Sequence, residues 1–137
     1  MVEPGEDTSD WLDQARMNLL VAGDLIKGGR PEEAITSSFT AMVYAARATL
    51  GGQDSELSGW EDVVRVFQNE ALPALGLSKE NQRALIIVAD LYTRIAHTRE
   101  MEADPVTAAA CLDDAWAFVR EIEGKIASGI EDRDEGT

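Results

Sequence analysis

The stretch DWLDQARMNLLVAGDLIKGGRPEEAITSSFTAMVYAARATL, residues 10–50, decides the fold class, because it holds two helical patterns separated by a stop. In its first half, apolar residues recur at steps of three and four, which is the spacing of one helix face; they are Leu12, Ala15, Leu19, Ala22 and Ile26. Gly28 and Gly29 supply the positive φ at which helices end, and Pro31 suits the first position of the next helix. The stretch therefore predicts two helices, over about 10–27 and 31–50.

The second of these helices carries two different stripes. The larger side chains are Ile35, Phe39, Met42, Ala46 and Leu50. The other stripe is small: Ala34, Ser37, Ser38, Ala41, Ala45 and Ala48. Small side chains let a neighbouring helix approach closely, so we expect another helix to pack tightly here.

Three further helices are predicted, over about 59–71, 78–97 and 105–129. Their start and stop signals are the capping-box spacing of Ser58 and Glu61, Pro73 with Gly76, a Ser78 cap, and Asp104 with Pro105. The fourth helix is apolar nearly all round over residues 84–95, which is typical of a central helix or one in a subunit interface. No run of residues alternates as a strand would.

We therefore predict an all-α fold: an antiparallel up-down four-helix bundle with one additional short helix. Residues 1–9 are expected to be a disordered lead, residues 10–129 a single helical-bundle domain, and residues 130–137 a disordered acidic tail. A chain of 137 residues suffices for one such core.

The charge balance bears on the choice of partners. The chain has 12 basic and 26 acidic residues, a net charge of −14. Such a surface repels phosphate on average, so RNA binding is disfavoured, although a small basic site remains possible. The longest purely apolar run, residues 84–89, is far shorter than a membrane span. Without a signal-peptide pattern either, we expect a cytoplasmic protein with no membrane contact.

The sequence offers few residues for metal binding or thiol chemistry. Cys111 is the only cysteine, which excludes an intrachain disulfide, and its apolar helical surroundings predict a small buried hydrophobe. His97 is the only histidine, whereas a di-iron bundle needs two Glu-x-x-His pairs. We expect no metal and no cofactor, and no phosphate loop or dinucleotide fingerprint is present.

The stretch YTRIAHTRE, residues 92–100, is the candidate site. Arg94, His97 and Arg99 gather two permanent cations and one titratable ring at the end of a helix. His97 could move the proton of a ribose 2′-hydroxyl while Arg94 or Arg99 stabilises charge on the phosphorus. The same groups could instead bind a nucleotide phosphate, with Arg47 and Tyr44 beside them. The simplest alternative is a helix end favoured by positive charge, with packing and surface roles for Arg47 and Tyr44.

The order of several segments resembles the HEPN domain family (higher eukaryotes and prokaryotes nucleotide-binding). The segments are residues 15–20, LIKGGRPEEA at 25–34, YAARATL at 44–50, Arg94 in the fourth helix, and ACLDDAWAFV at 110–119. The resemblance covers roughly residues 10–127. It implies a bundle of four to five helices, often a homodimer.

The resemblance also implies a choice of activities. Many members are metal-independent ribonucleases, often toxins; others bind nucleotides or pair with a minimal nucleotidyltransferase. The ribonuclease motif has four to six residues between its Arg and its His, whereas only two separate Arg94 from His97. We therefore expect a HEPN-like module that binds a partner protein or a nucleotide or RNA, without robust catalysis. The alternatives are a ribonuclease that uses Arg94 and His97, and a structural interaction bundle unrelated to HEPN.

Overall fold

The computed structural model describes residues 4–50, 59–98 and 103–135, with side chains described over 8–50, 59–97 and 103–128. Within these ranges the chain is helical and contains no strand, so the predicted all-α class is confirmed. The elements, in chain order, are α1 (Pro4–Lys27), α2 (Pro31–Ala48), α3 (Trp60–Val66), the π-helical turn η2 (Phe67–Ala71), α4 (Leu72–Leu75), α5 (Lys79–Thr98) and α6 (Pro105–Glu135).

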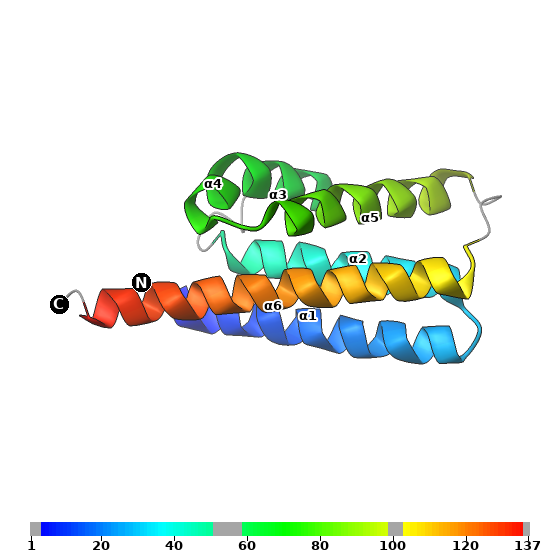
Figure 1. Ribbon diagram of the computed structural model, residues 1–137, viewed down its shortest axis with the longest axis horizontal. Helices are drawn as coiled ribbons and strands as arrows, with labels where there is room; N and C mark the ends of the chain where they lie inside the picture. The colour runs from blue at the N-terminus through cyan, green and yellow to red at the C-terminus, as the bar shows by residue number, and fades with distance from the viewer. Residues whose placement is uncertain (1–3, 51–58, 99–102, 136–137) are drawn as a thin grey trace.

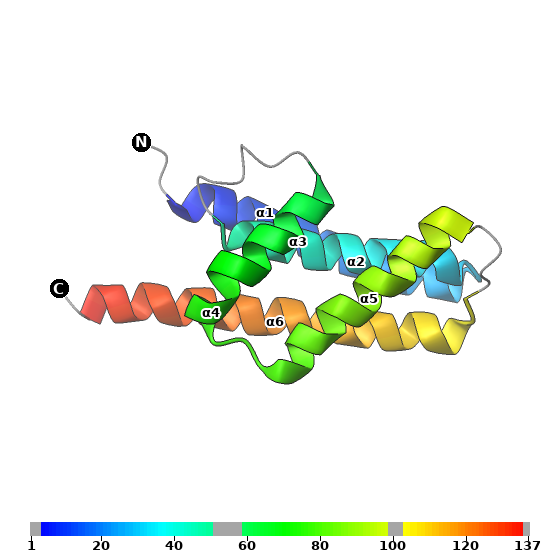
Figure 2. The same ribbon diagram turned by 90° about the horizontal axis from the view of Figure 1, so that it is seen from above.

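The four long helices alternate in direction along the long axis of the molecule (Figure 1). Helix α2 lies between α1 and α5, and it also contacts α6, so the centre is formed by α2 and α6. Seen from above, α5 crosses α2 and α6 obliquely rather than lying parallel to them (Figure 2). The short α3–η2–α4 segment lies above the C-terminal end of α2, before the start of α5.

Two helix ends differ from the predicted boundaries. Helix α1 begins at Pro4, so residues 4–9 extend a helix that was expected to begin at Asp10. Pro4 suits a helix start, and the Thr8 hydroxyl donates to the Ala48 carbonyl oxygen at 3.2 Å, which ties this turn to α2. Helix α6 runs past Gly129 to Glu135, because no proline follows and a glycine costs a helix only about 1 kcal/mol.

Other boundaries follow the predicted local chemistry. Gly29 has φ +77°, and the Arg30 N–H donates to the Leu25 carbonyl at 2.9 Å, which closes α1 as expected. The Ser78 hydroxyl accepts from the Asn81 N–H at 3.2 Å at the start of α5. Asp104 caps α6 in the same way through the Thr107 N–H at 2.7 Å. Ser58, the predicted cap of the short helix, lies outside the described residues.

The predicted short helix over 59–71 is divided in the structure. After α3, the Leu72 N–H bonds the Phe67 carbonyl across a π-turn, and the helix then continues to Leu75. Pro73 has no N–H to give to the carbonyl four residues before it, so the wider turn spans the place where an α-helical bond is missing. Of the two predicted stop residues, Gly76, with φ +67°, ends the helix, whereas Pro73 lies within α4.

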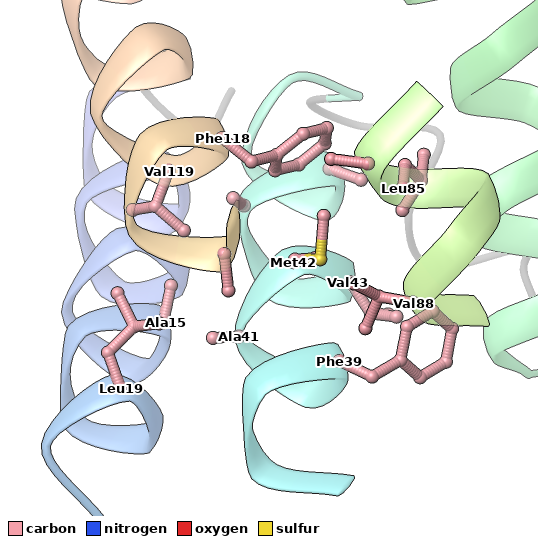
Figure 3. Close-up of a cluster of buried hydrophobic side chains, with 14 of the residues drawn as sticks. Ala15, Leu19, Phe39, Ala41, Met42, Val43, Leu85, Val88, Phe118 and Val119 are labelled. Carbon is pink, nitrogen blue, oxygen red and sulfur yellow. The ribbon is translucent and has the colours of Figure 1, made fainter. Parts of the chain in front are cut away.

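The core lies between α1, α2, α5 and α6 (Figure 3). Its largest fully buried side chains include Phe39, Met42, Leu85 and Phe118, which come from α2, α5 and α6. Among the described elements, the interface of α1 with α2 is the most extensive. The fully buried small residues of these two helices include Ala15, Ala22, Ala34, Ala41 and Ala45. Most of the small stripe of α2 is therefore buried, which is consistent with the close helix packing that its sequence predicts.

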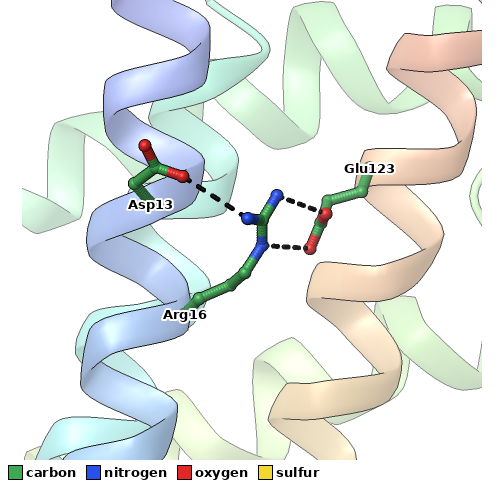
Figure 4. A network of polar contacts seen from close by, with 3 residues as sticks. All are labelled: Asp13, Arg16 and Glu123. Atoms are coloured by element: carbon green, nitrogen blue, oxygen red, sulfur yellow. Dashed lines mark hydrogen bonds and ion pairs between the residues drawn. The ribbon is translucent and has the colours of Figure 1, made fainter.

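A polar clamp joins α1 to α6 on the surface (Figure 4). The Arg16 guanidinium donates to both carboxylate oxygens of Glu123, at 2.7 and 3.3 Å, and also contacts Asp13 at 3.4 Å. A paired arrangement of two parallel bonds fixes direction as well as distance. The clamp therefore marks where α1 and α6 face each other on the surface.

Candidate functional site

Two of the predicted site residues lie together near the C-terminal end of α5. Arg94 and His97 are both exposed and stand one helical turn apart. The Arg94 Nε lies 3.1 Å from the Asp90 carboxylate, with both side chains more than half exposed. An exposed ion pair of this kind contributes little to stability. Arg99, the third cation of the predicted site, lies outside the described residues.

Tyr44 and Arg47 lie on α2 and contact Trp11 of α1. The Tyr44 and Trp11 rings are 5.2 Å apart, and the Arg47 guanidinium carbon is 5.0 Å from the centre of the Trp11 ring. A guanidinium over an indole face is a cation–π contact. These side chains therefore help to join α1 to α2.

The structure does not bring Arg94 and His97 of α5 together with Tyr44 and Arg47 of α2. Phe39 of α2 stacks on Tyr92 of α5 at 4.8 Å, which fixes where the antiparallel helices cross. From that contact Arg47 lies about 12 Å further along α2 and His97 about 8 Å further along α5, at 1.5 Å per residue. Because the two helices run in opposite directions, these displacements point to opposite ends of the molecule (Figure 1). A single phosphate cannot be held by both groups in this arrangement.

The sequence of α5 indicated a central helix or a subunit interface, but not which of its apolar residues face outward. Leu85 and Val88 point into the core, whereas Ile86 and Ile87 are 58% and 55% exposed. On the same outer face, Arg83, Asp90 and Arg94 are exposed as well. The face therefore has an apolar centre with charges of both signs around it. In the sequence, this exposed apolar surface was indicated only by the lack of a polar face in residues 84–89.

A second apolar surface lies on α1. Met17 and Leu20 are 60% and 61% exposed, and Val21 is 45% exposed. The core stripe of this helix faces the other way, with Ala15 and Leu19 buried. The sequence contained the signal for this surface, since α1 has more large apolar residues than one face can bury.

The remaining reactive groups do not form a site in the part of the chain that the structure describes. Cys111 is buried, and burial together with nearby Asp114 raises the pKa of its thiol to about 11, so it is not a ready nucleophile. No three side chains among the described His, Cys, Asp and Glu residues are placed to hold a metal ion. The predicted small buried role of Cys111 is confirmed.

Comparison with known proteins gives no family for this chain. No protein-family model matches it, and no curated protein matches it significantly. Over the described helices, none combines the length and the apolar character that crossing a membrane requires.

Proposed function

We propose that this chain is a non-catalytic helical interaction module that works as a homodimer. The observation that carries the proposal is the outer face of α5, where Ile86 and Ile87 are exposed between charged residues of both signs. Exposed apolar side chains gathered on one surface commonly mark a protein interface. The separation of Arg47 from Arg94 and His97 argues against a phosphate site as the main function.

The charge pattern of α5 is complementary to itself. Suppose that two copies of α5 pair antiparallel, with the twofold axis between Ile86 and Ile87. The isoleucines of the two copies then meet at the centre, and Arg83 faces Asp90 of the partner subunit on both sides of the axis. Residues 83, 86, 87 and 90 share one helix face, so one pairing brings these four together. Arg94 falls opposite Lys79 of the partner subunit and keeps its ion pair with Asp90 of its own helix at 3.1 Å.

The family assignment is part of the proposal. The order of helices and the position of Arg94 near the end of α5 are compatible with a divergent HEPN domain. The alternating directions of α1, α2, α5 and α6 support an up-down four-helix bundle, modified by the oblique crossing of α5. By analogy with that family, the dimer would bind a minimal nucleotidyltransferase or another protein.

The first test is the molar mass in solution, measured by light scattering after size exclusion. We expect about twice the chain mass of 14.9 kDa for the wild type. Ile86→Asp places a charge at the centre of the proposed interface and should give a monomer. The matched control is Leu20→Asp, which adds the same charge on exposed α1 and should leave a dimer. A wild-type monomer at high protein concentration would reject the homodimer.

A ribonuclease is the second candidate, because Arg94 and His97 are exposed one turn apart on α5. His97 would transfer the proton of a 2′-hydroxyl, and Arg94 would hold the phosphate. The test is cleavage of a mixed transfer and messenger RNA pool in the presence of a chelator. Cleavage by the wild type and none by His97→Ala would support a ribonuclease and reject a purely binding role.

A further inference from the structure

The geometry points to a docking groove between α1 and α6 that accepts a basic amphipathic helix of a partner protein. This inference rests on the proposed function as an interaction module, and it adds the chemistry of the partner. What we call the groove is the surface where Leu20 of α1 meets Trp116 of α6, and Met17 continues it along the outer face of α1. It is separate from the outer face of α5, because α1 and α5 lie on opposite sides of α2 (Figure 1).

Two contacts fix how α1 and α6 face each other. Arg16 binds Glu123, and the Leu112 Cδ2 atom lies 3.9 Å from the position that a Cβ on Gly23 would take. The helices are antiparallel, so interpolation between these contacts places Leu20 opposite Trp116. Leu112 and Trp116 stand four residues apart and share the side of α6 that faces α1.

The groove has the composition of a binding surface rather than of a solvated one. Met17 and Leu20 are 60% and 61% exposed, and Trp116 is half-buried with Arg120 5.0 Å from its ring centre. Tryptophan, methionine and arginine are enriched in protein interfaces, and partly buried tryptophans dominate their energetics. The Arg120 stem can cover the indole until a partner replaces it.

Carboxylates border the apolar residues at both ends. Asp13, Met17, Leu20 and Asp24 occur at helical spacings along one face of α1, so an acid stands one turn beyond each apolar residue. Asp113 adds an exposed carboxylate one turn from Trp116 on α6. Arg16 does not offset these charges fully, because it is held by Glu123 and Asp13.

The carboxylates around the groove favour a different protein over a second copy of this chain as the occupant. A second copy docked on the same groove would bring Asp13, Asp24 and Asp113 against their own counterparts, and like charges in an interface are unfavourable. A helix with leucine-type side chains on one face and Lys or Arg at its margins complements both the apolar centre and the acidic border.

The test uses a synthetic helical peptide of about 18 residues, with Leu at core spacings and Lys elsewhere, and a matched peptide with Glu in place of Lys. Binding to the full chain is measured by fluorescence anisotropy. We expect the Lys peptide to bind and the Glu peptide not to bind. Leu20→Asp should weaken binding about tenfold or more, since it removes a buried apolar contact.

The control separates this groove from general acidity and from the dimer interface. Ile86→Asp adds the same negative charge as Leu20→Asp, so attraction by net charge alone would strengthen binding in both variants. We expect Ile86→Asp to bind the Lys peptide as the wild type does. The proposed groove would be overturned if Leu20→Asp bound the Lys peptide as tightly as the wild type does, or if the wild type did not bind it.

The two proposals can fail separately. If the wild type is a dimer but Leu20→Asp does not affect peptide binding, the groove is wrong and the homodimer stands. If the wild type is a monomer but peptide binding depends on Leu20, the α5 interface is wrong and the groove stands.

Discussion

At the scale of single residues, burial and hydrogen bonding decide which polar groups are reactive. Cys111 is enclosed in the core and is a packing residue, whereas His97 is exposed. Glu121 of α6 accepts the Ser78 N–H at 2.8 Å and an Asn81 amide N–H at 3.1 Å, so this carboxylate helps to hold the start of α5. The bonds of Glu121 join segments that lie far apart in the sequence, so a local sequence pattern does not reveal them.

The Cys111 thiol should be unreactive in the folded protein. Its pKa of about 11 leaves almost no thiolate at pH 8, and its side chain is buried. We expect a disulfide reagent such as DTNB to react with no thiol at pH 8 until denaturant is added, and then with one thiol per chain. Full reaction within seconds in the folded protein would contradict the buried placement.

Glu121 should contribute a pH-dependent part of stability. Burial acts to raise its pKa, but hydrogen bonds from Ser78 and Asn81 outweigh this, so the pKa is lowered from 4.5. A lowered pKa in the folded state gives stability that is complete above pH 4.5 and lost as the pH falls through the folded value. Urea unfolding should therefore show Glu121→Gln to be less stable than wild type at pH 7, with the gap narrowing at pH 3. An equal difference in stability between the two proteins at pH 7 and pH 3 would argue against the hydrogen bonds from Ser78 and Asn81.

At the scale of elements, caps and stops were predictable because each depends on a few neighbouring residues. Gly29, Ser78 and Asp104 perform the roles that their positions indicate. The π-turn before Pro73 and the extension of α1 to Pro4 were not predicted. The π-turn follows from the missing N–H of Pro73, a local cause whose effect on the turn type was overlooked. The extension of α1 is supported by a distant contact, the bond from Thr8 to Ala48.

Two glycines offer a matched pair of substitutions, one at a helix end and one inside a helix. Gly76 has φ +67° and no atom near its missing Cβ, so Gly76→Ala introduces backbone strain alone and should destabilise the fold by roughly 1–2 kcal/mol. Gly124 lies inside α6 with equally open surroundings, so Gly124→Ala should stabilise it by about 0.5–1 kcal/mol. The free energies of unfolding in urea check both signs. Stabilisation by Gly76→Ala would contradict the left-handed end of α4.

At the scale of the whole molecule, the sequence predicts the helices but not the faces that they expose. Residues 84–89 are apolar on every side, so their periodicity could not tell that Leu85 points inward and Ile86 outward. The order of Arg94, His97, Arg47 and Tyr44 along the chain likewise could not show that the first pair and the second lie at different ends. The separation arises from the antiparallel crossing of α2 and α5 at Phe39 and Tyr92. Among the exposed side chains, large apolar ones gather on α1 and α5, where Met17, Leu20, Ile86 and Ile87 are each more than half exposed.

The most direct test of this account is a charge-reversal cycle at α5, followed by sedimentation equilibrium. Arg83→Glu and Asp90→Lys should each weaken the dimer, because each places like charges opposite one another in the proposed pairing. The double variant Arg83→Glu/Asp90→Lys restores opposite charges on both sides of the axis, and we expect it to recover a dimer. A double variant as monomeric as the single variants, or single variants as dimeric as the wild type, would contradict the α5 pairing.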